Sequence, residues 1–222
     1  MAKSTSGSPA FSKPSGIVRP LVGLYLLLGA TTTVMAGPGG PGGPKQGLVD
    51  MLIEYLSAKY IGVDLGDDVL YVSVQRQTLF HIQAGQLMAS YPISTAAAGL
   101  GIRQDSYRTP LGLHRIAACF GSEVPVGGVF EERVFTGQVA DSSDIGRDLI
   151  TSRILWLEGA EPGVNVGPGI DSMQRKIYIH GTTDSQALGR PASKGCIRMS
   201  DLDVIELFDR VAAGTAVVIL DN

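Results

Sequence analysis

The spacing of apolar residues changes from a helical to a strand period near residue 60. Residues 48–58 hold apolar side chains three and four positions apart, which predicts a short amphipathic helix packed on the domain. Beyond it, apolar residues alternate with polar ones, a period typical of strands separated by short turns. The strands expected from this pattern cover 60–64, 69–75, 78–83, 86–94, 111–118, 152–158, 175–180 and 215–220.

Two further segments complete the expected domain. Residues 121–150 carry scattered Gly, Asp and Ser, and we expect a long excursion over the sheet there. Ser200 is a suitable N-cap for a helix over Asp201–Ala212, which ends at Gly214. The sum is a mostly β domain of the α+β class with a helix late in the chain. It lacks the regular βαβ alternation of a doubly wound fold.

The first 47 residues differ in composition from the rest. Residues 1–36 carry three basic residues and no acid, and their last sixteen, 21–36, are mostly apolar. This pattern predicts a secretory signal peptide cleaved after Ala36, or an uncleaved anchor that tethers the chain to the inner membrane. Residues 37–47 (GPGGPGGPKQG) read as a Gly/Pro-rich linker. Either alternative places the domain expected over 59–222 in the periplasm or cell envelope.

Charge and composition exclude several classes of function. The 18 basic and 21 acidic residues give a net charge of −3 without a basic stripe, so nucleic acid is not an expected partner. Three histidines spread over the chain do not predict a metal site, and no motif predicts a cofactor. Cys119 and Cys196 are the only cysteines, and in an exported protein they could form a disulfide.

One stretch carries candidate chemistry. A hydrophobic strand ends in His180, and Cys196 follows sixteen residues later. An imidazole is the usual base that activates a thiol, and the loop between them could bring the two together. Gly195 lets backbone N–H groups approach a carbonyl oxygen, Arg198 supplies a charge suited to a carboxylate, and Lys194 favours a thiolate. On residue types alone, a small buried cysteine and a hydrogen-bonded histidine ring are the more usual interpretation of such a pair.

The same stretch resembles the signature of the L,D-transpeptidase catalytic domain family of YkuD type. The family has a strand that ends in His-Gly, a loop with a glycine, then Ser-His-Gly-Cys, an apolar residue and Arg or Asn. Further matching segments are Gly189, Tyr91–Thr95 (YPIST), Thr109–Gly112 (TPLG) and Gly214–Ile219 (GTAVVI), so the likeness runs from about Tyr60 to Leu220. Lys194 departs from the pattern, since the family usually has a histidine there.

The resemblance implies a fold and a set of roles. The fold is the L,D-transpeptidase β-sandwich with a helix after the catalytic cysteine loop. Cys196 is then the nucleophile and His180 its base, with the ring oriented by the Gly181 carbonyl. The remaining candidates are the backbone N–H groups of Gly195 and Cys196 for the oxyanion, Arg198 for a substrate carboxylate or for holding the loop, Ser193 for the turn, and Lys194 for the substrate cleft. Cys119 matches no motif of the family and is expected to be a free structural thiol.

The implied activity is acyl transfer on peptidoglycan stem peptides, which serve as donor and acceptor. A tetrapeptide donor releases D-alanine, and the acyl group then passes to another stem as a 3–3 cross-link or to an envelope protein. Two alternatives stay open. Water could be the acceptor, as in an L,D-carboxypeptidase, or the domain could be a catalytically inactive module that binds peptidoglycan.

Overall fold

The computed structural model describes residues 44–222, so segment 1–36 and most of the expected linker lie outside the described part of the chain. The elements are α1 (Pro44–Lys59), β1 (Asp68–Ser73), β2 (Thr78–Gln83), β3 (Gln86–Pro92), β4 (Gly112–Phe120), β5 (Gly128–Glu131), β6 (Val134–Val139), the 3₁₀ turn η1 (Ser142–Asp144), β7 (Ile150–Gly159), β8 (Tyr178–Gly181), the 3₁₀ turn η2 (Ser185–Ala187), β9 (Ile197–Met199), α2 (Asp201–Phe208) and β10 (Ala216–Leu220). The fold is a mostly β mixed sheet with two helices, as the sequence predicts.

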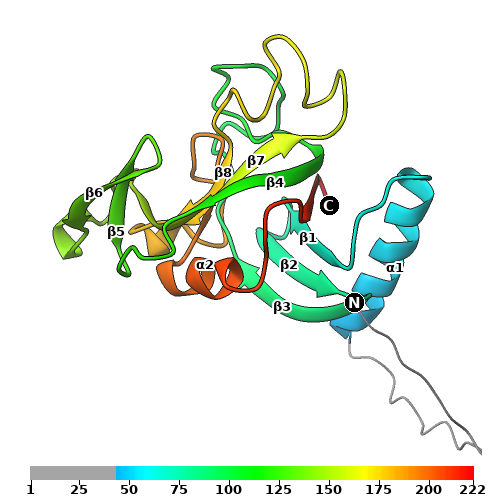
Figure 1. The fold of residues 1–222 in the computed structure, drawn as a ribbon, viewed down its shortest axis with the longest axis horizontal. Helices are drawn as coiled ribbons and strands as arrows, with labels where there is room; N and C mark the ends of the chain where they lie inside the picture. The colour runs from blue at the N-terminus through cyan, green and yellow to red at the C-terminus, as the bar shows by residue number, and fades with distance from the viewer. Residues whose placement is uncertain (1–43) are drawn as a thin grey trace, which may run out of the picture. The chain divides into compact units, whose positions relative to one another are not determined.

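The strands of residues 44–222 form a ten-stranded sheet. Its order is β3-β2-β1-β10-β4-β7-β5-β6, while β8 pairs with β7 and β9 pairs with β8. Only β1 with β10 and β8 with β9 run parallel. Figure 1 shows the β5–β6 hairpin at one side of the view and α1 at the other. The chain therefore returns at its end to place β10 in the middle of the sheet, beside the first strand.

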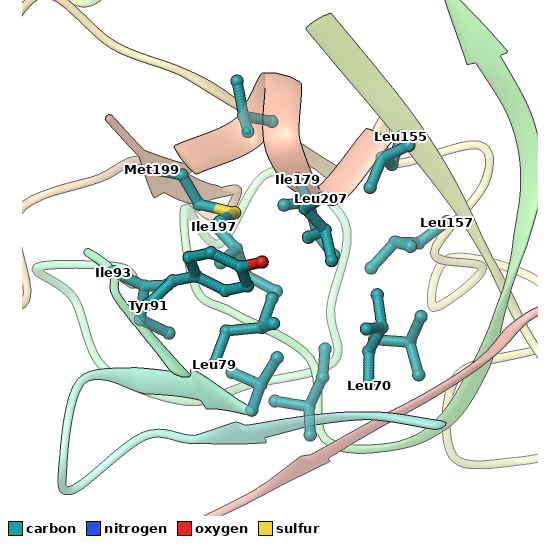
Figure 2. Close-up of a cluster of buried hydrophobic side chains, with 14 of the residues drawn as sticks. Leu70, Leu79, Tyr91, Ile93, Leu155, Leu157, Ile179, Ile197, Met199 and Leu207 are labelled. Atoms are coloured by element: carbon teal, nitrogen blue, oxygen red, sulfur yellow. The ribbon is translucent and has the colours of Figure 1, made fainter. Parts of the chain in front are cut away.

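The main core lies between β1–β3 and the layer formed by β7–β9 and α2. Leu70 and Leu79 from the first strands face Leu157, Ile179 and other apolar side chains of the second layer, and all are at most a few per cent exposed (Figure 2). The sheet thus curls over on itself like a sandwich. Burial of this many aliphatic side chains contributes about 1.5–3 kcal/mol for each.

Helix α1 covers the opposite face of β1, β2 and β10. Its buried residues, Val49, Leu52 and Leu56, pack against alternate side chains of those strands. The helix begins at Pro44, inside the segment predicted to be linker. A proline is well accepted in the first turn of a helix because it lacks only an N–H that has no intrahelical partner there.

The structure contradicts two predictions of local structure. Residues 60–64 do not form a strand: residues 60–62 form a turn in which Gly62 has a positive φ of 78° and the Val63 N–H bonds to the Tyr60 carbonyl oxygen at 3.0 Å. Residues 121–150 contain the β5–β6 hairpin where a loop excursion is predicted. Its two-residue turn, Glu132–Arg133, has positive φ at both positions. Hairpin turns of this kind usually contain Asn-Gly, so the residues at this turn did not predict a hairpin.

The predicted second helix is present but ends early. Ser200 caps it as expected, because its Oγ accepts the backbone N–H of Asp203 at 3.1 Å. Helix α2 ends at Phe208 and not at Ala212. There the N–H of Arg210 bonds to the carbonyl of Leu207 at 3.0 Å, which tightens the last turn and stops the helix.

His114 is a buried structural histidine on β4. Its Nδ1 lies 3.0 Å from the Gly112 carbonyl oxygen and its Nε2 lies 2.9 Å from Ser172 Oγ. Burial lowers the pKa of its imidazole to about 4. The His114 imidazole takes up a proton near pH 6.5 in the unfolded chain but only near pH 4 in the folded protein. The free energy of unfolding therefore falls as the pH falls from 6.5 towards 4. The loss from this one residue is roughly 3 kcal/mol over that range.

His114→Gln is therefore expected to flatten the pH dependence of stability. The variant keeps a polar partner for Ser172 but cannot take up the proton. Urea unfolding of both proteins at pH 7 and pH 4.5 measures the difference. An equal fall in the free energy of unfolding for both would contradict the assignment.

Candidate active site

The fold brings His180 and the cysteine loop together through two neighbouring strands. His180 lies on β8, opposite Arg198 of the parallel strand β9, and Cys196 immediately precedes β9. Hydrogen bonds join the loop between the two strands to the segment that follows β3. One of them runs from the Gly189 N–H to the Ile93 carbonyl oxygen at 2.9 Å. His180 and Cys196 then line one cavity of about 110 Å³; its other walls are Asp148, Ile150, Ser193, Lys194 and Arg198.

The His180 imidazole is held in a defined tautomer. Its Nδ1 lies 2.7 Å from the Gly181 carbonyl oxygen, which can only accept, so Nδ1 carries the proton and Nε2 has the free lone pair. The ring is 2% exposed. Burial lowers the pKa of His180 to about 4, although the bond to Gly181 opposes the shift. The ring is therefore neutral at neutral pH, with an unprotonated Nε2.

The Cys196 thiol is partly exposed and rests on backbone groups. Sγ accepts the Tyr178 N–H at 3.4 Å and donates to the Lys176 carbonyl oxygen at 3.4 Å. Burial raises the pKa of the thiol to about 11 against the effect of the Tyr178 N–H, and the charge of Asp148 raises it further. Among residues 44–222 no hydrogen bond joins Sγ to His180. The resting pair is thus a neutral thiol and a neutral imidazole at one cavity.

Two side-chain hydroxyl groups hold the backbone at Gly195 and Cys196 through hydrogen bonds. Thr109 donates to the Gly195 carbonyl oxygen at 3.0 Å. Ser193 Oγ accepts the Gly195 N–H at 3.2 Å and donates to the Cys196 carbonyl oxygen at 2.6 Å. The Gly195 N–H is therefore engaged within the loop. No hydrogen bond from the Cys196 N–H is present in the described part of the chain.

Gly181 permits a close approach that another residue would prevent. A Cβ at this position would lie 2.5 Å from Asp201 Oδ1 and 2.6 Å from the Thr151 carbonyl oxygen. Asp201 is itself fixed, because its Oδ1 accepts the hydroxyls of Thr151 and Ser152, each at 2.6 Å. The carbonyl that holds the His180 ring is therefore packed against a rigid polar cluster at the start of α2.

The turn of the β5–β6 hairpin reaches the residues that contact the thiol. Glu132 pairs with Lys176, and Arg133 donates to the Tyr178 hydroxyl at 2.7 Å. The Arg133 guanidinium also lies 4.3 Å from the centre of the Trp156 ring. Sequence reasoning missed these residues because they fall in the segment predicted to be an irregular loop. No local pattern relates a hairpin turn to a distant strand end.

Asp148 is the second feature that the sequence did not reveal. It bonds to the Arg198 guanidinium, and its Oδ2 lies 3.2 Å from Lys194 Nζ. Burial acts to raise the pKa of the Asp148 carboxyl, but the charges of Arg198 and Lys194 outweigh it and hold the pKa below its usual value. Arg198 is only 5% exposed, so its guanidinium contacts the Asp148 carboxylate and has little contact with solvent.

A larger hollow elsewhere lacks comparable chemistry. It has a volume of about 630 Å³ and lies between α1, β2, β3 and the loop at Gly189. Its lining contains neither a cysteine nor a histidine nor a carboxylate. The small cavity at Cys196 is therefore the candidate active site.

Comparison with known protein families identifies the family of this domain. The family model of the YkuD L,D-transpeptidase catalytic domain matches residues 67–219. This chain belongs to the YkuD L,D-transpeptidase family. The match runs from just before β1 to the next-to-last residue of β10 and includes α2, while helix α1 precedes it.

Two Bacillus subtilis (strain 168) proteins are similar in sequence. "Putative L,D-transpeptidase YqjB" is 38% identical over 110 residues, which cover 44% of this chain and 61% of the relative. "Putative L,D-transpeptidase YkuD" is 46% identical over 59 residues, which cover 26% of this chain and 36% of the relative. The matches thus span less than two thirds of these relatives.

Solved structures of L,D-transpeptidases are more distant. The enzyme from Mycobacterium tuberculosis H37Rv is 15% identical with a TM-score of 0.46, and the alignment covers 70% of this chain and 58% of that one. The enzyme from Mycobacterium smegmatis is 14% identical with a TM-score of 0.43, and the alignment covers 69% of this chain and 58% of that one.

Most of the residues that the sequence singled out lie together in this YkuD-family domain. His180, Ser193, Lys194, Cys196 and Arg198 line the cavity, while Gly181 and Gly195 lie directly beside it. Both cysteines are free thiols. In the described part of the chain, no cluster of side chains could hold a metal ion and no helix is long and apolar enough to cross a membrane.

Proposed function

We propose that this chain is a cysteine-dependent L,D-transpeptidase that acts on the stem peptides of peptidoglycan. One observation carries the proposal: Cys196 and a neutral His180 with a free Nε2 line the same cavity. Nucleophilic catalysis by a thiol needs such a base within reach. Membership of the YkuD family supports the choice of substrate.

The first half-reaction acylates the cysteine. The thiol turns from the Lys176 carbonyl towards His180, and its proton passes to Nε2 as sulfur attacks the carbonyl carbon before the terminal D-alanine of a tetrapeptide. The Cys196 N–H stabilises the oxygen of the tetrahedral intermediate. The carbon–nitrogen bond then breaks as His180 returns its proton to the leaving amine. D-alanine departs, and the acyl group stays on Cys196 as a thioester.

The second half-reaction transfers the acyl group. An acceptor amine attacks the thioester, loses a proton to His180, and the released thiolate recovers that proton. A stem-peptide amine gives a 3–3 cross-link, and a protein lysine attaches an envelope protein. Residues 1–36 fit this proposal as the segment that exports the enzyme to the cell envelope or anchors it there.

The low pKa of His180 predicts an unusual pH profile for acylation. A base with a pKa of about 4 stays unprotonated throughout the range where an ordinary histidine titrates. The rate of acylation by imipenem is therefore expected to stay level from pH 8 down to about pH 5 and to fall only below that. Stopped-flow measurement on the full chain tests it; a fall centred near pH 6.5 would show that His180 titrates as if in solvent.

The proposed function itself is tested in two steps. Intact mass spectrometry after incubation with imipenem is expected to show one adduct, located on Cys196 by peptide mapping. Incubation with purified sacculi, followed by muropeptide analysis, is then expected to yield 3–3 linked dimers. Tripeptides without dimers would assign water as the acceptor, and binding to sacculi without any adduct would indicate an inactive binding module.

A further inference from the structure

The cavity contains a carboxylate of the protein itself. Asp148 places one oxygen on Arg198 and the other 3.2 Å from Lys194 Nζ. Both cations line the same cavity as Cys196 and His180. Each of these two contacts joins a cation to a carboxylate oxygen, and hydrogen bonds between charged groups are stronger than those between neutral groups.

The fit of Asp148 to this site is incomplete. Arg198 is buried, yet its Nε has no hydrogen-bond partner in the described part of the chain, since Asp148 contacts only a terminal guanidinium nitrogen. A carboxylate that binds a guanidinium side-on uses two of its nitrogen atoms. Asp148 does not have that geometry, because its second oxygen lies 3.2 Å from Nζ of Lys194, whose side chain is 69% exposed. Another carboxylate could therefore satisfy Arg198 better.

The segment that carries Asp148 is held by few other contacts. Its residues from Asp141 to Asp148 are exposed except for Asp144, which is partly buried. Among residues 44–222, the hydrogen bond that joins this segment to the rest of the domain, besides those of Asp148, runs from the Thr183 hydroxyl to the Asp144 carbonyl oxygen at 3.1 Å. Segments with few buried contacts open at low cost in free energy. Release of Asp148 would thus disturb neither the sheet nor the core.

We infer that Lys194 and Arg198 form a subsite for a carboxylate of the substrate, and that Asp148 occupies this subsite until the substrate displaces it. This inference rests on the proposed function, since it names the group that the same cavity recognises. Exchange of one carboxylate for another leaves the charge beside Cys196 unchanged. The exchange therefore selects substrates that carry a carboxylate and excludes neutral peptides, which cannot replace Asp148.

A stem peptide offers two carboxylates near the bond that breaks. One belongs to the terminal D-alanine of the donor, and the other belongs to the diaminopimelate side chain. Their chemistry is the same, so peptides amidated at one or the other position distinguish them. Peptides with both groups free provide the reference.

The test compares the affinity of these peptides for three proteins: the Cys196→Ala reference and two variants of it. Asp148→Asn removes the competing charge but keeps an oxygen that can accept from Arg198, and Asp144→Asn is the matched control in the same segment. Each is combined with Cys196→Ala, so that calorimetry measures binding without turnover. Asp148→Asn is expected to bind the free peptide about fivefold more tightly, the gain from removing a partly exposed competing ion pair.

The inference is tested by how the gain in affinity differs between the free and the amidated peptides. The gain is expected to vanish when the recognised carboxylate is amidated and to persist when the other one is. Asp144→Asn is expected to change none of the affinities. An equal gain for all peptides, no gain, or weaker binding by Asp148→Asn would overturn the inference. Absence of an imipenem adduct on the wild-type chain would instead refute the proposed function, whereas these affinities would still report on the subsite.

Discussion

Cys196→Ala is expected to abolish both the imipenem adduct and the formation of 3–3 linked dimers. The sulfur supplies the bond that holds the acyl group, so no other side chain at the cavity can replace it. The expected fall in rate is to the background of the assay, about 10⁴-fold or more. Intact mass spectrometry and muropeptide analysis provide the measurements.

Cys119→Ala is the matched control for this substitution. Cys119 lies on β4, packs partly buried beside the main core, and has its pKa raised by burial. Cys119 does not line the cavity, so its replacement removes a sulfur atom outside the proposed site and is expected to leave adduct formation unchanged. Adduct formation that survives Cys196→Ala, or disappears in Cys119→Ala, would move the nucleophile elsewhere.

Gly181→Ala is expected to slow acylation by about 10²-fold. The new methyl group would overlap the Thr151 carbonyl oxygen and Asp201 Oδ1, and the backbone oxygen cannot move aside like the end of a flexible side chain. The strand must shift, and the carbonyl that holds His180 Nδ1 shifts with it. We also expect a loss of stability of about 2–4 kcal/mol, typical of an overpacked site.

A second measurement separates catalysis from folding. The acylation rate is measured at a temperature where circular dichroism shows the variant fully folded, so that the slower rate reports on the position of the imidazole. Gly47→Ala is the control, because a Cβ there meets no atom within 4 Å. Acylation by folded Gly181→Ala at the wild-type rate would show that the Gly181 carbonyl does not position the base.

The neutral state of the resting pair gives these predictions a common basis. Burial raises the pKa of Cys196 and lowers that of His180, so neither group carries a charge before the substrate arrives. Proton transfer between them must then accompany attack on the carbonyl carbon. The thiol is consequently expected to be protected from unspecific alkylation at neutral pH, since the thiolate is the reactive form.

Local patterns in the sequence determined much of the framework. Short apolar segments bounded by turn residues located β2 at its observed bounds and β1, β3, β4 and β7 within two residues, although β1 and β2 are buried on both faces, between the main core and α1. Ser200 indicated the start of α2 through its capping side chain. The spacing of His180, Gly195 and Cys196 by itself left a purely structural role open, and the candidate chemistry came from the resemblance of this stretch to the L,D-transpeptidase signature.

Tertiary structure alone decided the surroundings of that chemistry. The pairing of Asp148 with Arg198, the contact of Arg133 with Tyr178 and the bond from Thr109 to Gly195 join residues that lie 45 or more positions apart. Such contacts depend on how strands pair and how the sheet curls. Neither propensity nor periodicity contains that information, since both describe only neighbours along the chain.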